Sequence, residues 1–186
     1  WPESVQLSFN LSAVELCSAS SAARILQIAE RHGLDPARLQ IEVTETALLA
    51  DFETARLNLE RLRAAGAGVV LDDFGAGYAS IAYLREMSFD AIKIDGALVT
   101  GAVTSAPALR LLKGVVDLCA SLGVPCVAEH IERDDQLALL RRLGCRDGQG
   151  YALSPPLDPA GARTLAASRV VPFPLDKAQP RSRRAA

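Results

Sequence analysis

One segment organises this sequence: Val69-Val70-Leu71-Asp72-Asp73-Phe74-Gly75-Ala76-Gly77-Tyr78. Its apolar, β-branched start is typical of a strand that is buried on both faces, as in a parallel sheet. Two adjacent carboxylates follow, where burial would be costly if folding were their only task. In α/β proteins, functional groups gather at the carboxyl ends of the strands. We therefore expect Asp72 to point into a site and Asp73 to turn toward the same site as the strand gives way to a loop. A strand-end acid followed by a helix N-cap is the simpler alternative.

Alternating strand and helix patterns lie on both sides of this segment. We expect six strands, at residues 5–11, 39–45, 69–71, 91–95, 126–131 and 148–152. Helices are predicted between and after them, at residues 21–32, 51–65, 80–87, 107–122, 134–143 and 158–167. Beyond residue 172, prolines and basic residues indicate a loose tail. We therefore divide the chain into a domain of residues 1–168 and a tail of residues 169–186.

The unbroken alternation of strand and helix indicates an α/β fold with a parallel sheet and right-handed crossovers. Polar residues end nearly every strand, which favours a TIM-barrel-like (β/α)8 fold. The alternative, a doubly wound open sheet, would concentrate its site at one switch point. A barrel of eight units usually needs about 250 residues, whereas this chain has 186 and enters a strand pattern almost at once. We expect the last six strand–helix units of a barrel, without the first two.

Composition narrows the classes of function. Hydrophobic residues make up 49% of the chain, which indicates a globular domain, and the formal net charge is -2. Such a charge gives no field that would attract a nucleic acid polymer or an acidic membrane. We find no signal peptide and no apolar run that could span a bilayer. We expect a cytoplasmic bacterial domain, whose parent chain could still be anchored to a membrane.

The predicted strand ends carry polar side chains that would face one mouth: Asn10, Glu42, Asp72, Asp73, Lys93, Glu129 and Gln149. Carboxylate and amide oxygens are the hard donors that Mg²⁺ and Mn²⁺ prefer, and they suit zinc poorly. Crowded carboxylates repel one another unless cations lie between them. Asp72 could bridge two metal ions, the arrangement that activates a water and clamps a phosphodiester. A lysine among the acids could orient that water or stabilise developing negative charge.

Six short strings, in order, resemble the EAL domain, the bacterial phosphodiesterase that linearises cyclic di-GMP to pGpG. They are Ser8-Phe9-Asn10-Leu11-Ser12, Ile41-Glu42-Val43-Thr44-Glu45-Thr46, the run from Leu71 to Tyr78, Ile92-Lys93-Ile94-Asp95, Ala128-Glu129-His130-Ile131-Glu132 and Gln149-Gly150-Tyr151. The resemblance covers about residues 5–167. The Asp-Asp-Phe-Gly-x-Gly-Tyr string is specific, and the other strings are strong only together.

The resemblance implies a role for each polar residue. The metal ligands, for two Mg²⁺ or Mn²⁺ ions in the intact domain, would be Asn10, Glu42, Asp72 and Asp73. The residues that hold the attacking water and serve the base chemistry would be Lys93, Glu129 and Gln149. Glu45 would brace the loop of residues 74–80, which couples the metal site to homodimer contacts, and Glu132 would shape the substrate end of the pocket. Besides cyclic di-GMP and a second copy of the chain, the implied partners are sensory or GGDEF domains upstream in the parent chain.

The sequence departs from the family at three places. The Glu-Ala-Leu signature, whose glutamate is a metal ligand, lies on an earlier strand and is absent here. His130 stands where the family usually has glycine, and Gly96-Ala97-Leu98 replaces a bulkier segment. We therefore expect this chain to be a weak or inactive cyclic di-GMP phosphodiesterase by itself. A catalytically degenerate receptor or scaffold for cyclic di-GMP is the main alternative, and a one-metal enolate enzyme is a third, which the doubled aspartate disfavours.

Overall fold

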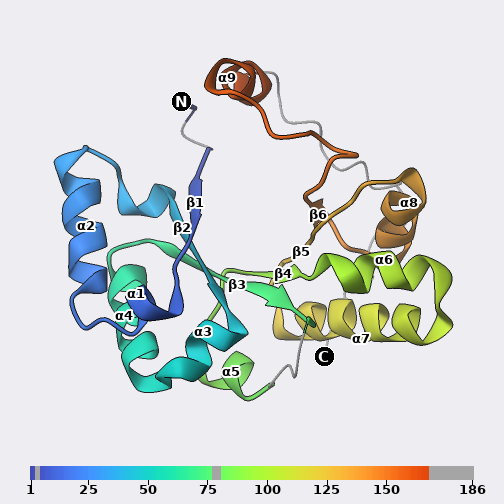
Figure 1. The fold of residues 1–186 in the computed structure, drawn as a ribbon, viewed down its shortest axis with the longest axis horizontal. Helices are drawn as coiled ribbons and strands as arrows, with labels where there is room; N and C mark the ends of the chain where they lie inside the picture. Colours follow the sequence, from blue (N-terminus) through green and yellow to red (C-terminus); the bar gives the residue numbers. More distant parts are fainter. Residues whose placement is uncertain (3–4, 77–80, 168–186) are drawn as a thin grey trace, which may run out of the picture.

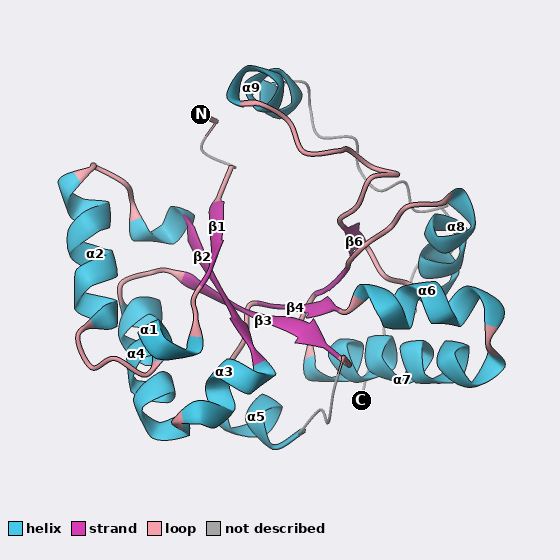
Figure 2. Ribbon diagram, viewed as in Figure 1, coloured by secondary structure: helices cyan, strands magenta, loops and turns pink. Residues whose placement is uncertain are grey.

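A computed structural model describes residues 1–2, 5–76 and 81–167 of the chain. Its centre is a parallel sheet of six strands that lie side by side in chain order. The strands are β1 (Leu7–Asn10), β2 (Leu39–Thr44), β3 (Gly68–Phe74), β4 (Ala91–Ile94), β5 (Cys126–Ala128) and β6 (Asp147–Gly148). The sheet curls into a half-barrel (Figure 2), which confirms the expected TIM-barrel-like α/β fold.

Helices connect successive strands and pack around the sheet, except for the last helix, which follows the final strand and has no buried residues (Figure 1). They are α1 (Ala13–Leu16), α2 (Ser21–Arg31), α3 (Glu45–Ala50), α4 (Phe52–Ala64), α5 (Ile81–Glu86), α6 (Gly96–Thr104), α7 (Ala106–Leu122), α8 (Asp134–Leu143) and α9 (Pro159–Ala167), with a 3₁₀ turn at η1 (Pro36–Arg38). Among the described helices, we find none whose length and apolar content would let it cross a membrane. The predicted tail of residues 169–186 and the predicted helix start at residue 80 lie outside the described residues.

Three short helices were not predicted from the sequence, namely α1, α3 and α6. Each begins after a polar side chain that accepts a hydrogen bond from a backbone N–H of the first turn. The capping residues are Ser12 for α1, Thr44 for α3 and Asp95 for α6. Thr44 and Asp95 also fit the strand alternation, so the predicted strands 39–45 and 91–95 extend beyond the observed β2 and β4.

The last two strands differ from the prediction in a similar way. The predicted strand 126–131 ends at Ala128, and the predicted strand 148–152 is reduced to Asp147–Gly148. The backbone of His130 has φ 52°, a left-handed conformation that no regular strand contains. The residues after Ala128 therefore leave the ladder, although their alternating pattern is typical of a strand.

The apolar run that opens β3 is buried on both faces, as predicted. Val69, Val70 and Leu71 are almost completely inaccessible to solvent. Their neighbours on the adjoining strands, Ile41 and Ile92, are also completely buried. This central block keeps the strands in register and fixes where their carboxyl ends lie.

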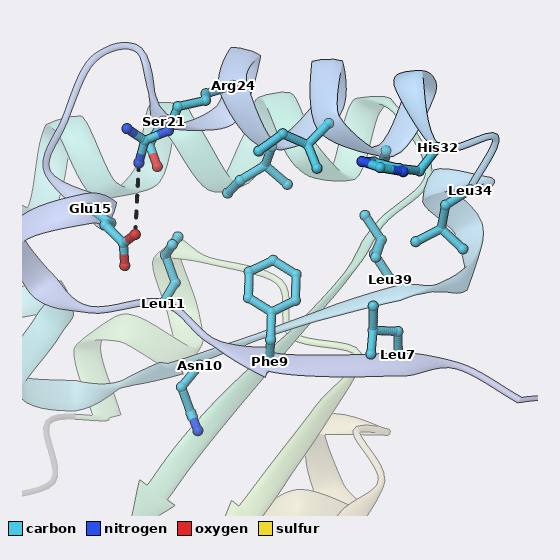
Figure 3. Close-up of a pocket in the computed structure, with 13 residues that line it drawn as sticks. Leu7, Phe9, Asn10, Leu11, Glu15, Ser21, Arg24, His32, Leu34 and Leu39 are labelled. Carbon is cyan, nitrogen blue, oxygen red and sulfur yellow. Dashed lines mark ion pairs between the residues drawn. The ribbon is translucent and has the colours of Figure 1, made fainter. Parts of the chain in front are cut away.

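The outer strand β1 is less well covered than predicted. Leu7 is 54% exposed, whereas Leu11 on the same predicted apolar face is only 5% exposed. An apolar cavity of about 470 Å³ lies between β1 and α2 (Figure 3), lined mainly by leucine, isoleucine and phenylalanine side chains. An ion pair between Arg24 and Glu15, 3.7 Å long, lies at one end of it. This cavity marks the open edge of the half-barrel and is separate from the carboxylates of the neighbouring strands.

Gly150 packs closely against the backbone of Ile131, so a substitution at position 150 measures how firmly the segments after β5 and β6 pack together. Its φ is 153°, and a Cβ there would lie 2.7 Å from the carbonyl carbon of Ile131, which is itself completely buried. We expect Gly150→Ala to lower the free energy of unfolding by about 2 kcal/mol or more, because neither backbone can move away. The measurement is a urea denaturation curve followed by circular dichroism.

Gly114→Ala is the matched control, because it lies within α7 and a Cβ there meets nothing within 4 Å. We expect this substitution to stabilise the chain by about 0.5–1 kcal/mol, since alanine replaces glycine inside a helix. Equal stability of the two variants would contradict the close packing of Gly150 on Ile131.

Candidate functional site

Polar side chains from all six strands meet at one edge of the sheet, because parallel strands place their carboxyl ends together. Asn10 ends β1, Glu42 lies near the end of β2, and Lys93 lies near the end of β4. Asp72 and Asp73 lie within β3, Glu129 follows β5 and Gln149 follows β6. The structure thus places all seven residues predicted for the mouth at the same end of the half-barrel.

The ammonium group of Lys93 is the centre of this edge. Its Nζ lies 2.7 Å from Glu129 Oε1, 2.9 Å from Glu42 Oε2 and 3.0 Å from Asp72 Oδ1. Lys93 and Asp72 are each 7% exposed and Glu129 is 5% exposed. Three carboxylates from different strands therefore share one buried positive charge, which offsets part of the cost of burying them.

A bulge in β3 brings Asp73 to the same site as Asp72. Leu71 pairs with Ile92 and Phe74 pairs with Ile94, so β3 uses one residue more than β4 over this interval. Asp73 has φ 56°, and its N–H donates to Asp72 Oδ1 over 3.1 Å. A regular strand would send adjacent side chains to opposite faces, and the bulge re-aims one of them. The strand also continues to Phe74, beyond the predicted end at residue 71.

Within the described part of the chain, one set of acidic, histidine or cysteine side chains is close enough to hold a metal ion. Oxygen atoms of Asp72, Asp73 and Glu129 all lie within 4.8 Å of one another. An all-oxygen donor set fits Mg²⁺ or Mn²⁺ better than zinc. Glu129, predicted to serve the base chemistry, is thus grouped with the two predicted aspartate ligands.

Glu42 and Asn10 lie beside this set. Glu42 accepts hydrogen bonds from Lys93 Nζ and Ser8 Oγ. The Asn10 amide, oriented with its nitrogen toward the acids, donates to Asp72 Oδ2 at 3.1 Å and to Glu42 Oε2 at 3.3 Å. Both residues therefore support the carboxylates through hydrogen bonds in this structure.

The site shifts the pKa values of its members in directions that follow from burial and charge. Burial and the nearby charges of Asp72 and Asp73 raise the pKa of Glu129, although Lys93 opposes the shift. Burial and the charge of Asp72 likewise raise the pKa of Asp73. Burial would lower the pKa of Lys93, but its hydrogen bonds to the three carboxylates outweigh burial and raise the pKa above its usual value. Lys93 therefore stays protonated at neutral pH, while the two acids hold their protons more readily than usual.

Two cavities open at the site. One, of about 520 Å³, is lined by Asn10, Glu42, Asp72 and Asp73 together with residues that follow β1 and β2. The other, of about 470 Å³, is lined by residues that follow β5 and β6, including Glu132 and Gln149. Asp72 and Asp73 of the acid cluster line the first cavity, whereas none of the clustered acids lines the second.

Three predicted residues lie outside the hydrogen-bonded cluster. Gln149 and Glu132 are both exposed on the second cavity. Glu45 is half-buried and is the first residue of α3, whereas the sequence placed it at the end of a strand. The loop that Glu45 is predicted to brace includes residues 77–80, which lie outside the described residues.

Ser8 is a site residue that the sequence interpretation missed. Its hydroxyl donates to the Glu42 carboxylate, and it lies two residues before Asn10 on the same strand. Side chains two apart on a strand share a face, so the Ser8–Asn10 spacing was an available signal. A lone serine at a strand end was too common a feature to single out.

Comparison with known proteins gives one family and several solved relatives. The EAL domain family matches residues 1–156. The cyclic di-GMP phosphodiesterase RocR of Pseudomonas aeruginosa is 36% identical over 153 residues, which are 82% of this chain and 39% of RocR. The chain spans about a fifth of the length of two further curated relatives that it matches.

Solved structures agree with the sequence match. The phosphodiesterase of Pseudomonas aeruginosa MucR, in complex with cyclic di-GMP, has a TM-score of 0.79 and 32% identity over 84% of this chain and 64% of that chain. Klebsiella pneumoniae BlrP1, solved with manganese and cyclic di-GMP, has a TM-score of 0.76 and 34% identity over 81% of this chain and 39% of that chain. Both the match over residues 1–156 and the half-barrel with its acidic edge lead to one conclusion: the chain belongs to the EAL domain family.

Proposed function

We propose that this chain forms part of a cyclic di-GMP-specific phosphodiesterase, which hydrolyses cyclic di-GMP to pGpG. The observation that carries the proposal is the cluster of Asp72, Asp73 and Glu129, in which Asp72 and Glu129 also pair with Lys93. Such a cluster can bind cations and a phosphodiester together, as hydrolysis of this bond requires. The names of RocR and MucR, which include this activity or this ligand, support the assignment.

The cofactors proposed are two Mg²⁺ or Mn²⁺ ions. Asp72, Asp73 and Glu129 would hold them, with Glu42 and Asn10 beside them as further oxygen donors. The ions would supply Lewis-acid catalysis, offsetting charge on the phosphate and making water a better nucleophile. Manganese in the BlrP1 complex supports this choice of ion.

Three side chains would supply the other chemical steps of hydrolysis. A carboxylate oxygen of Glu129 that is not bound to an ion could accept a proton from the attacking water. Lys93 stays charged and can offset the negative charge that grows on the phosphate oxygens. Gln149, exposed at the second cavity, can orient the water or the substrate with its amide. The water oxygen forms a new bond to phosphorus, one ester P–O bond breaks, and the leaving oxygen takes up a proton to become a hydroxyl, which gives the linear dinucleotide pGpG.

A receptor that binds cyclic di-GMP without cleaving it is the second candidate. It would need the pocket but not the cluster of buried acids around Lys93. Retention of that costly cluster favours the enzyme, because unneeded buried charge is destabilising.

Turnover by the 186-residue chain tests the function directly. We expect slow conversion of cyclic di-GMP to pGpG in the presence of Mn²⁺, because β1 is an edge strand that pairs only with β2 and so holds Asn10 and its neighbours less firmly than a closed barrel would. Product is followed by chromatography, with the parent-length protein assayed beside it. Binding of cyclic di-GMP without turnover by either protein would favour the receptor.

Among the substitutions proposed here, Asp72→Asn should reduce activity most. We expect Asp72→Asn to lower Mn²⁺-dependent turnover by at least about 100-fold and to weaken Mn²⁺ binding, because a neutral amide replaces a shared carboxylate. Turnover is measured by chromatography and metal affinity by calorimetry. Asp117→Asn, an exposed acid on α7, is the control and should change neither quantity. Activity within a few-fold of the unchanged chain would exclude Asp72 as a shared ligand.

Lys93→Met should lower the stability of the chain, because the carboxylates around Lys93 would then repel one another without a cation between them. We expect a loss of about 3 kcal/mol in stability at pH 7.5 without metal, since three carboxylates lose their common partner. The loss should shrink toward pH 5, because the raised pKa values of Glu129 and Asp73 let these acids take up protons as the pH falls. Added Mn²⁺ should stabilise the variant more than the unchanged chain.

Thermal melts with and without Mn²⁺ at the two pH values make this measurement. Lys113→Met is the control, because Lys113 forms an exposed pair with Asp117 on α7 and should contribute less than about 1 kcal/mol. If the two lysine variants have the same melting temperature at pH 7.5, Lys93 does not neutralise the carboxylate cluster.

Two partners accompany the proposed activity. We propose a homodimer through the loop that follows Asp73, and sensory or GGDEF domains upstream in the parent chain. The bifunctional cyclase and phosphodiesterase MucR supports the second partner. Sedimentation of the parent-length protein, with and without cyclic di-GMP, tests the first.

A further inference from the structure

His130 adopts an unusual backbone conformation beside the site. Only two non-glycine residues in the described ranges have positive φ, His130 at 52° and Asp73 at 56°. Side chains are disfavoured in this left-handed region, which glycine occupies without cost. Both strained residues lie at the mouth of the half-barrel, where such strain is most often retained for function.

The surrounding structure holds His130 in this conformation. On one side, the N–H of Glu129 donates to Ile94 O over 3.1 Å. On the other, the N–H of Ile131 donates to Gln149 O over 3.0 Å, and the Ile131 side chain is completely buried. The backbone of residue 130 is therefore fixed by β4 on one side and by the segment after β6 on the other.

The side chain of His130 lies directly on Gly96, the first residue of α6. A Cβ at position 96 would be 2.5 Å from both Cγ and Nδ1 of His130. Any residue other than glycine would therefore displace the imidazole. The sequence departures at positions 96 and 130 are one spatial feature, in which the missing side chain of one residue makes room for the other.

From this position the imidazole reaches the second cavity. His130 is exposed and lines the 470 Å³ cavity together with Gln149 and Tyr151. His130 directly follows Glu129 of the acid cluster in the chain, so this residue connects that cluster with the lining of the second cavity.

We infer that His130 is a substrate-contacting residue, whose ring N–H donates a hydrogen bond to the cyclic dinucleotide beside the phosphodiester that is cleaved. The inference rests on the proposed function, because it assigns a further contact for the same substrate. Gly96 is the residue that permits the contact, and it touches no substrate itself. A space-filling role for His130 is the competing explanation.

The two explanations differ in what His130→Gly does. If His130 contacts substrate, the variant binds cyclic di-GMP about 3- to 10-fold more weakly, the loss of one hydrogen bond. Its melting temperature is then at or above that of the unchanged chain, because glycine relieves the left-handed strain. If His130 only fills space, the variant melts lower and binds cyclic di-GMP equally well.

The measurement is calorimetric titration of the 186-residue chain with cyclic di-GMP in the presence of Ca²⁺, the pair of ligands in a solved BlrP1 complex. The sample is checked afterwards for pGpG by chromatography. The conservative variant His130→Asn should bind within about 2-fold of the unchanged chain, since asparagine tolerates positive φ and keeps an N–H donor. In turnover assays, His130→Gly should raise KM more than it lowers kcat.

Gly96→Ala completes the test by displacing the imidazole without removing it. We expect Gly96→Ala to weaken binding as much as His130→Gly, and to cause no further loss when the two substitutions are combined. Gly101→Ala, on the same helix, is the control, because a Cβ there meets only Ala108 Cβ at an ordinary 3.5 Å. This variant should bind as the unchanged chain does.

The binding measurements distinguish failure of the inference about His130 from failure of the proposed function. If the unchanged chain binds cyclic di-GMP and both His130→Gly and Gly96→Ala bind it equally well, the inference fails and the proposed function stands. If the unchanged chain does not bind cyclic di-GMP at all, both fail together.

Discussion

The structure depends on one buried positive charge. Lys93 lies on a strand whose flanking residues, Ile92 and Ile94, are completely buried, and its ammonium is bound by acids from three other segments. Removing an ammonium from water costs several kcal/mol unless well-placed partners replace the water. The same holds for each carboxylate. The four groups are therefore tolerable only together, and the sheet must bring β2, β3, β4 and the segment after β5 into one arrangement to satisfy them.

The sequence predicts the order of the elements well because their signals are local. Buried apolar runs, helix caps and glycine stops each involve a few adjacent residues, and the six strands were located from them. The strand ends were less accurate, since residues such as Thr44 and Asp95 satisfy both the strand alternation and the capping preference. Whether such a residue continues the strand or caps a helix depends on whether the helix can pack against the rest of the fold, and a single sequence does not show this.

The sequence predicts which residues form the site, but it does not predict which of their side chains contact one another. The sequence predicts Glu42 as a ligand and Glu129 as part of the base chemistry. In the structure, oxygen atoms of Glu129 and the two aspartates lie within 4.8 Å of one another, while Glu42 accepts hydrogen bonds from Lys93 and Ser8. The bulge that turns Asp73 toward this group depends on the pairing of β3 with β4, which a single sequence does not show. The contact between Gly96 and His130 joins residues far apart in the chain, so it also required three-dimensional coordinates.

The alternation of Ile92, Lys93 and Ile94 also bears on how the sheet selects its own pairing. In a parallel sheet that is covered on both faces, an apolar run such as residues 69–71 fits many alignments with its neighbours almost equally well. A slip of β4 by one residue would exchange its two faces. The ammonium would then lie unpaired among the apolar side chains of the helices, and an isoleucine would face the carboxylates. Misaligned sheets are thus penalised by the same buried charges that meet at the carboxyl ends of the strands, so the cluster around Lys93 also gives the sheet a unique alignment.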